Sequence, residues 1–176
     1  MPPRVLSHAA LVHAVSGGKP QETEKKETVR QAELRRAYQR LTALMIFLKE
    51  NPCGDLIVLP LPRNLTNSST REHWALTEAH DQYFDHCDIV LGQGLIPKPP
   101  KEAPAKIKLE ATLYVTQEMD EDNASGRMKW PTDWLVKRGY VANDTKKNIV
   151  REKYPDQVVV KADLQRIELK ITPLEG

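Results

Sequence analysis

A nine-residue run of alternating side chains constrains the fold of this chain more than any other part of its sequence. Apolar residues occupy every second position from 107 to 115, and polar residues such as Lys108, Glu110 and Thr112 stand between them. This period of two is typical of a β-strand with one face on a hydrophobic core and the other toward solvent. The run therefore predicts a sheet with one covered face.

The elements predicted around this strand define the fold class. Helices are expected at 29–52, 70–91 and about 122–138, and further strands at 56–62, 158–162 and 166–172. The prolines that close 56–62 indicate a strand at a sheet edge. After the first helix the order is β-α-β-α-β-β, which predicts an α+β fold with one small mixed sheet packed with helices.

The 176 residues suit one domain with a modest core and extra residues before it. Residues 1–28 are predicted to be a flexible N-terminal segment, 29–52 an additional amphipathic helix, and 55–176 the main domain. The helix carries basic residues opposite its apolar face. Two interpretations stay open: the helix docks on the core or on a second subunit, or its basic face touches nucleic acid.

Charge and cysteine content limit the classes of protein. The 26 basic and 24 acidic side chains leave a net charge of +2, which argues against a protein that coats DNA through bulk charge. No run approaches the roughly 18 apolar residues of a membrane span. Gly92 and Gly94 lack a phosphate-loop motif, so no nucleotide cofactor is expected. Cys53 and Cys87 are predicted to be free thiols, as in a reducing cytoplasm.

The acidic segment 120–144 is the strongest candidate for chemistry. Asp120 and Asp122 stand at i and i+2 at the predicted end of a strand, where extended geometry would point both carboxylates the same way. Such a pair can share a hard cation such as Mg²⁺. Asp122 and Asn123 are also good N-cap residues, so a capped helix without any metal is the alternative.

Lys129 and Asp133 are four residues apart in the predicted helix, which is the spacing of an ion pair. Held in this way, Lys129 could bring a positive charge to a phosphate; the alternative is a solvated helical lysine. Pro131 predicts that the helix kinks or restarts there. Asp144 lies beyond the helix end, so either the kink brings it back to Asp122 or it serves the site of a partner subunit.

Several motifs occur in one order over about 55–176. They are Asn67-Ser-Ser-Thr-Arg71-Glu-His73-Trp74 after a Leu-Pro-x-Pro strand, Asp120-Glu-Asp122-Asn123, Lys129, Asp133, Leu135, Gly139, Asn143-Asp144, Gln157-Val-Val and Arg166-Ile-Glu-Leu. This ordered set resembles the RusA family of phage and prophage Holliday-junction resolvases, and its last two motifs resemble the closing hairpin of that family. The first fifty residues are unmatched.

The resemblance implies a homodimeric endonuclease that nicks opposing strands of a four-way DNA junction, in the cytoplasm of a bacterium or a phage-infected cell. It implies that Asp120, Asp122 and Asp144 bind Mg²⁺, with Mn²⁺ as a substitute, and that Lys129 is the catalytic lysine. Asp133 would hold the Lys129 side chain in position through their ion pair. The residues expected to contact DNA are Asn67, Arg71, His73, Lys146 and Lys147.

The chain departs from the family pattern at two places, and two other functions stay open. Lys129 follows Asp122 at a longer spacing than in short members, so Arg127 could replace it, and Asn143 stands where the family often has a second aspartate. A non-catalytic DNA-binding protein could use Lys146, Lys147, Arg151 and Lys153 for phosphate contacts. A nuclease acting on flaps or forks is the nearer alternative.

Overall fold

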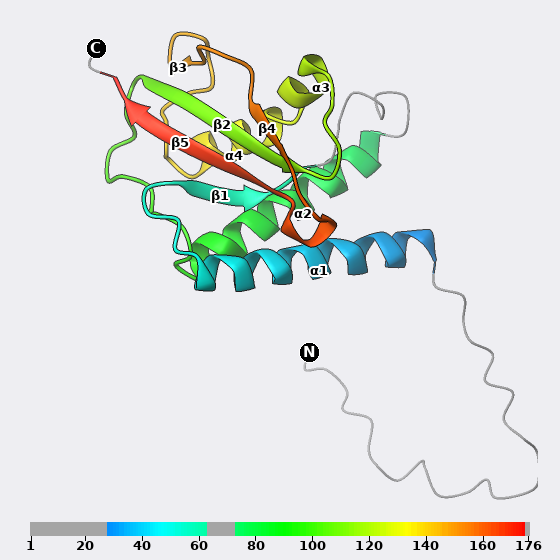
Figure 1. The fold of residues 1–176 in the computed structure, drawn as a ribbon. Coiled ribbons are helices and arrows are strands. Elements are labelled where there is room, and N and C mark those ends of the chain that lie inside the picture. The colour runs from blue at the N-terminus through cyan, green and yellow to red at the C-terminus, as the bar shows by residue number, and fades with distance from the viewer. Residues whose placement is uncertain (1–27, 63–72, 175–176) are drawn as a thin grey trace, which may run out of the picture.

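The computed structural model describes residues 28–62 and 73–174, which form one sheet with helices packed against it (Figure 1). The helices are α1 (Val29–Glu50), α2 (His73–Gly92), α3 (Glu121–Gly126) and α4 (Lys129–Lys137). The strands are β1 (Ile57–Pro60), β2 (Ile107–Val115), β3 (Ile149–Val150), β4 (Asp156–Val159) and β5 (Arg166–Pro173), and the 3-10 helix η2 (Ala162–Leu164) precedes the last of them. The predicted α+β class with a small mixed sheet is confirmed. In these two ranges, no helix is long and apolar enough to cross a bilayer.

Strand β2 is the centre of the sheet. The strand order is β1-β5-β2-β3, and β4 also pairs with β2. Strand β5 runs antiparallel to β2, whereas β3 and β4 run parallel to it, so the sheet is mixed. Strand β1 pairs antiparallel with β5 at the end of the order, and it is therefore the edge strand that its prolines predict.

The hairpin expected from the last two strands is wrong, because β2 lies between β4 and β5. Val158 of β4 and Arg166 of β5 pair with the same residue, Tyr114, from its two sides. The chain between the two strands passes the end of β2, where the backbone N–H of Val160 donates to the carbonyl of Val115 at 2.7 Å. The connection thus carries the chain from one neighbour of β2 to the other.

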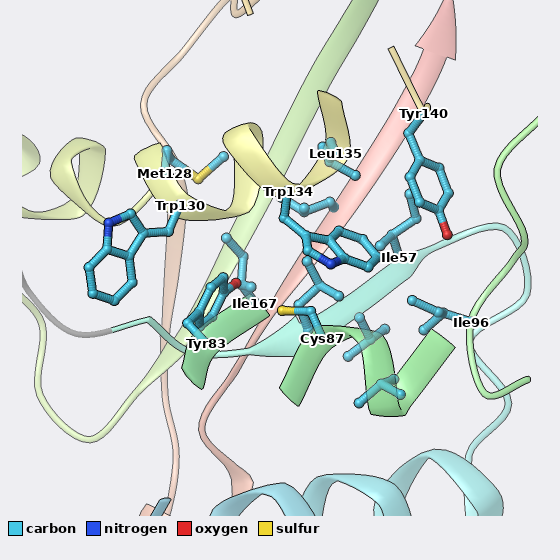
Figure 2. Packing of buried hydrophobic residues seen from close by; sticks show 14 of the residues in the cluster. Ile57, Tyr83, Cys87, Ile96, Met128, Trp130, Trp134, Leu135, Tyr140 and Ile167 are labelled. Carbon is cyan, nitrogen blue, oxygen red and sulfur yellow. The ribbon is translucent and has the colours of Figure 1, made fainter. Parts of the chain in front are cut away.

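One face of the sheet carries the hydrophobic core. Ile107, Leu109, Leu113 and Val115 of β2 are buried, as the alternating run predicts. Helices α2 and α4 lie behind the sheet in Figure 1, and their buried side chains join the same cluster. Figure 2 shows Trp134 of α4 between the sheet and α2, with its side chain fully buried. The helices therefore supply the cover that this face needs.

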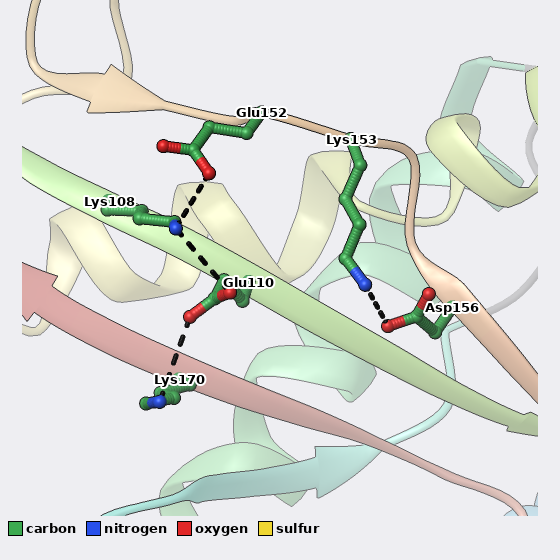
Figure 3. Close-up of polar contacts among 6 residues, drawn as sticks. All are labelled: Lys108, Glu110, Glu152, Lys153, Asp156 and Lys170. Atoms are coloured by element: carbon green, nitrogen blue, oxygen red, sulfur yellow. Dashed lines mark hydrogen bonds and ion pairs between the residues drawn. The ribbon is translucent and has the colours of Figure 1, made fainter.

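The other face of the sheet carries charged side chains (Figure 3). Lys108 pairs with Glu152 at 2.7 Å and with Glu110 at 3.7 Å, and Lys170 approaches Glu110 at 3.9 Å. These side chains are partly exposed, so each pair contributes little to the free energy of folding. Their position confirms which face of β2 meets solvent.

Helix α1 packs on the core, as the first interpretation of its amphipathic pattern predicts. Its start is a capping box, in which Thr28 Oγ1 accepts from the N–H of Gln31 and Gln31 Oε1 accepts from the N–H of Thr28. Leu41, Leu44 and Leu48 are buried in the core cluster, whereas Arg35, Arg36 and Arg40 are exposed. The helix ends two residues earlier than predicted.

The single helix predicted over 122–138 is wrong, because the structure has two helices separated at Arg127 and Met128. The helix restarts at Lys129, two residues before Pro131, so the restart that the proline predicts is present and the kink is not. Pro131 is the third residue of α4, where a backbone N–H would have no acceptor within the helix, so proline removes no hydrogen bond there. The first full turn is closed by the N–H of Thr132, which donates to the carbonyl of Met128 at 3.1 Å.

The two cysteines are free thiols, as predicted, and the fold sets different reactivities for them. The Cys87 side chain is wholly buried, and burial raises the pKa of its thiol strongly. Cys53 is part-buried, and burial raises its pKa also. Because alkylation needs an accessible thiolate, we expect iodoacetamide to modify Cys53 at least about tenfold faster than Cys87 in the native chain. Peptide mass spectrometry measures both rates; equal rates would contradict this packing of α2.

The pKa of His86 on α2 predicts a loss of stability at acidic pH. Burial lowers the pKa of its imidazole below the ordinary value, and Asp85 opposes this only in part. Below about pH 6.5 the unfolded chain therefore binds more protons than the folded chain, so stability falls as the pH decreases. We expect the urea midpoint to fall less between pH 7.5 and 5.0 in His86→Gln than in wild type. An equal fall in both proteins would contradict the buried neutral imidazole.

Candidate functional site

Asp120 begins α3 as its N-cap residue. Its Oδ1 accepts from the backbone N–H of Asn123 at 2.8 Å, and its Oδ2 accepts from the Asn123 side-chain amide at 2.7 Å. Asp122 is exposed in the first turn of the helix. The extended i, i+2 arrangement expected for these two aspartates is therefore wrong, and the predicted cap is present but belongs to Asp120 rather than to Asp122 or Asn123.

The end of α4 turns the chain toward Asp144. Gly139 has a φ of 79°, a left-handed conformation that favours glycine. Its N–H donates to the carbonyl of Val136 at 3.1 Å, and the N–H of Tyr140 donates to that of Leu135 at 2.9 Å, which is the Schellman pattern. The helix thus stops at Gly139 as predicted, and the next residues lead into the loop that carries Asp144.

Four polar residues gather beside α4, and we call them the α4 polar cluster: Lys129, Asp133, Asp144 and His80. Burial is the main cause that raises the pKa of the Asp133 carboxyl, and the nearby charge of Asp144 raises it further. Lys129 and His80 act in the opposite direction, because a positive charge favours the carboxylate. The four side chains are therefore electrostatic neighbours although they come from α2, α4 and the loop before β3.

Arg151 connects the chain after β3 to α4. Its Nη2 donates to Thr132 Oγ1 at 2.6 Å, and that hydroxyl donates to the carbonyl of Met128 at 2.6 Å. Burial lowers the pKa of the guanidinium, and Asp144 opposes this. Asp144 therefore lies within electrostatic reach of both Arg151 and Asp133, in the same chain.

His80 is a member of the cluster that the sequence reasoning missed. Its ring packs against Phe84 at 4.2 Å and edge-on to Trp130 at 5.6 Å between ring centroids. Its Nδ1 lies 3.3 Å from Asp81 Oδ1. Only the folded arrangement of α2 against α4 brings this histidine to Asp133, because the two residues are 53 positions apart in the sequence.

Arg127 holds the junction of α3 and α4 to the end of the β1 segment. Its Nη1 donates to the carbonyl of Pro62 at 2.5 Å, and burial lowers the pKa of its guanidinium, as does the positive charge of Arg40. Its Nε is buried without a hydrogen-bond partner among residues 28–62 and 73–174. These contacts give Arg127 a structural position, in contrast to the exposed side chain of Lys129.

The residues expected to contact DNA are only partly described. Asn67 and Arg71 lie outside the described residues, and of His73 the structure describes only its place at the start of α2. Lys146 and Lys147 are exposed in the turn that precedes β3. In that loop, the Asn143 side chain accepts from the N–H of Asp144 at 2.7 Å, so Asn143 fixes the backbone of its neighbour.

A metal ion held by protein side chains alone needs several ligands close together. Within the described part of the chain, no three histidine, cysteine, aspartate or glutamate side chains form a group that could hold a metal. Asp120, Asp122 and Asp144 are all described, so they do not form such a group here. Mg²⁺ accepts one or two protein carboxylates together with waters and phosphate oxygens, so Asp133 and Asp144, which are within electrostatic reach of each other, are the candidate ligands.

No protein-family model matches this chain, and no curated protein matches it.

Proposed function

We propose that this chain is a magnesium-dependent endonuclease that acts on four-way DNA junctions as a homodimer. The observation that carries the proposal is the α4 polar cluster, in which two carboxylates, Asp133 and Asp144, stand together with Lys129. Burial is the main cause that raises the pKa of the Asp133 carboxyl, and the charge of Asp144 adds to the rise, as expected for two carboxyl groups that repel each other. A hard cation would relieve this repulsion, and the ordered motifs around the cluster resemble those of junction resolvases.

Asp144 would hold Mg²⁺ together with Asp133. The family resemblance implies Asp120 and Asp122 as the other ligands, but these two do not form a metal-holding group with Asp144 in the described chain. The carboxylate oxygens of these residues are the ligands that Mg²⁺ prefers, and Mn²⁺ accepts the same ligands. The ion would supply Lewis acidity toward a scissile phosphate. Asp120 already accepts two hydrogen bonds from Asn123, which leaves Asp144 the stronger candidate.

Lys129 would provide the positive charge that the leaving oxygen needs during phosphodiester cleavage. Its side chain is exposed on the first turn of α4, and Asp133 stands one helical turn further on. Arg127 is less suited to this role, because its Nη1 donates to the carbonyl of Pro62 and its side chain is half-buried.

A non-catalytic DNA-binding protein is the second candidate, and the contacts of its proposed cations weaken it. Lys153 pairs with Asp156 at 2.5 Å, and Arg151 donates to Thr132 at 2.6 Å. Both cations are therefore partly committed within the fold, whereas Lys146 and Lys147 stay exposed for phosphate contacts. Two exposed lysines supply a modest electrostatic affinity for DNA.

A panel of labelled substrates separates these functions. Four-way junctions, flaps, forks and linear duplex are each incubated with the purified chain in Mg²⁺ and in EDTA. We expect nicking of the four-way junction in Mg²⁺ and binding without nicking in EDTA. Binding of the junction without nicking in either condition would indicate the non-catalytic protein, and preferential cleavage of flaps or forks would indicate a different branched substrate.

A further inference from the structure

Helices α1 and α2 line an open groove of about 920 Å³. Leu34 and Tyr38 of α1 and Ile89 of α2 line it, and these three apolar side chains are 36%, 56% and 38% exposed. Burying such side chains is favourable by roughly 25 cal/mol per Å² of apolar surface. The groove thus has an exposed apolar surface that none of the described residues covers.

The charged side chains that line the groove are all acidic. Glu78, Asp81 and Asp85 of α2 line the groove, and among residues 28–62 and 73–174 no lysine or arginine lines it. The exposed carboxylates of Asp81 and Asp85 stand along the same helix one turn apart. A segment that fits this groove should therefore be apolar, with basic side chains and without acidic ones.

Two buried nitrogens in the lining also lack partners. His86 is 6% exposed, and its Nε2 has no hydrogen-bond partner within the described ranges; the same is true of Gln82 Nε2. The His86 ring packs on Tyr38 at 5.2 Å between centroids, which keeps it in the wall of the groove. An unpaired buried polar group costs free energy, so main-chain carbonyls of a bound segment would be favourable partners.

We propose that residues 4–15 of this same chain dock in the groove. The segment reads Arg-Val-Leu-Ser-His-Ala-Ala-Leu-Val-His-Ala-Val. It contains apolar side chains, one arginine and two histidines, and it has no aspartate or glutamate, so its charge is complementary to the lining. The proposal does not depend on the nuclease function.

The position of the described chain start makes this contact geometrically accessible. Twelve residues, 16–27, separate the segment from Thr28, which caps α1. As a flexible linker they would span roughly 20 Å on average. Tyr38 lies about 15 Å along the helix from Thr28. The tether therefore reaches the groove, and a linker of this length gives an effective concentration in the millimolar range.

Hydrogen exchange measured by mass spectrometry on the full chain tests the proposal. We expect the amides of residues 5–15 to exchange about tenfold more slowly in wild type than in Ile89→Lys, because a lysine in the groove removes apolar contact. Ile46→Lys is the matched control: Ile46 is an exposed isoleucine of α1 outside the groove, so the protection should be retained. Unchanged exchange of β2 and β5 amides shows that both variants fold.

A charge exchange tests the same contact independently. Arg4→Glu should make the amides of residues 5–15 exchange faster, because it places a negative charge beside the acidic lining. Asp85→Arg combined with Arg4→Glu should restore the slow exchange of these amides. Fast exchange of residues 5–15 in wild type would overturn the proposal. Protection that increases with protein concentration would also overturn it, because the groove would then be occupied by a second copy.

Discussion

Replacing Asp144 by asparagine should reduce Mg²⁺-dependent junction nicking by about 100-fold or more. Asparagine keeps the size of the side chain and removes its negative charge, so it weakens cation binding while it changes the loop little. Asp144 is exposed, and its N–H bond to the Asn143 side chain uses the backbone only. The measurement is the single-turnover rate on a labelled four-way junction.

Asp163→Asn is the control for this prediction. Asp163 is an exposed aspartate in η2, on the part of the chain that contacts α1 rather than α4. It should nick at the wild-type rate. Junction binding in EDTA should be the same in both variants and in wild type. A wild-type nicking rate in Asp144→Asn would remove this residue from the proposed site.

Replacing Trp134 by alanine should destabilise the fold by roughly 3–5 kcal/mol, the range for truncation of large buried aromatic residues. The indole is fully buried, and its Nε1 donates to Asp88 Oδ1 at 2.9 Å. Asp88 also forms a bidentate pair with Arg138, in which Arg138 Nε donates to Oδ1. Truncation therefore leaves a cavity between α4 and α2 and removes one donor from a partly buried carboxylate.

Equilibrium urea unfolding measures this loss. Tyr154→Ala is the matched control, because Tyr154 is 53% exposed and its truncation should change the free energy of unfolding by less than about 0.5 kcal/mol. Equal effects of the two truncations would contradict the packing of Trp134. Where Trp134→Ala does not fold at all, Trp134→Phe should fold with a smaller loss, since it retains most of the ring contact.

The parts of the fold that the sequence predicted are those with a strong local pattern. The alternation at 107–115 predicted β2 and its buried face, because side chains on a strand point alternately to its two sides. The prolines near Pro60 predicted an edge strand, and Gly139 predicted the end of α4. Each of these signals depends on neighbouring residues only.

The errors come from pairings and hydrogen bonds between distant residues. The family resemblance implies a hairpin of β4 and β5, but β2 lies between them. Strand β3 has only two residues, which is too short for a periodic signal. The break at Arg127 agrees with the contact from Arg127 to Pro62, 65 positions away, which no local pattern reveals.

In the candidate site, too, local patterns predict some features and contacts between distant residues determine the others. The spacing of Lys129 and Asp133 predicts an ion pair, whereas the pKa of the Asp133 carboxyl is raised, mainly by burial, and Lys129 only opposes this rise. His80 and Asp144 also change the pKa of the Asp133 carboxyl. They do so only because α2 and the loop before β3 pack on α4, which no local pattern predicts. Asp120 and Asp122 were expected in an extended segment, whereas the cap made by Asp120 starts a helix.

Mapping the nicks on a synthetic four-way junction tests the central proposal most directly. Each strand is labelled in turn, and the products formed in Mg²⁺ are compared with those formed in EDTA on a denaturing gel. The proposal predicts nicks at symmetric positions on two opposing strands, present in Mg²⁺ and absent in EDTA. Intact strands with every divalent metal tried, although the junction is bound, would contradict it.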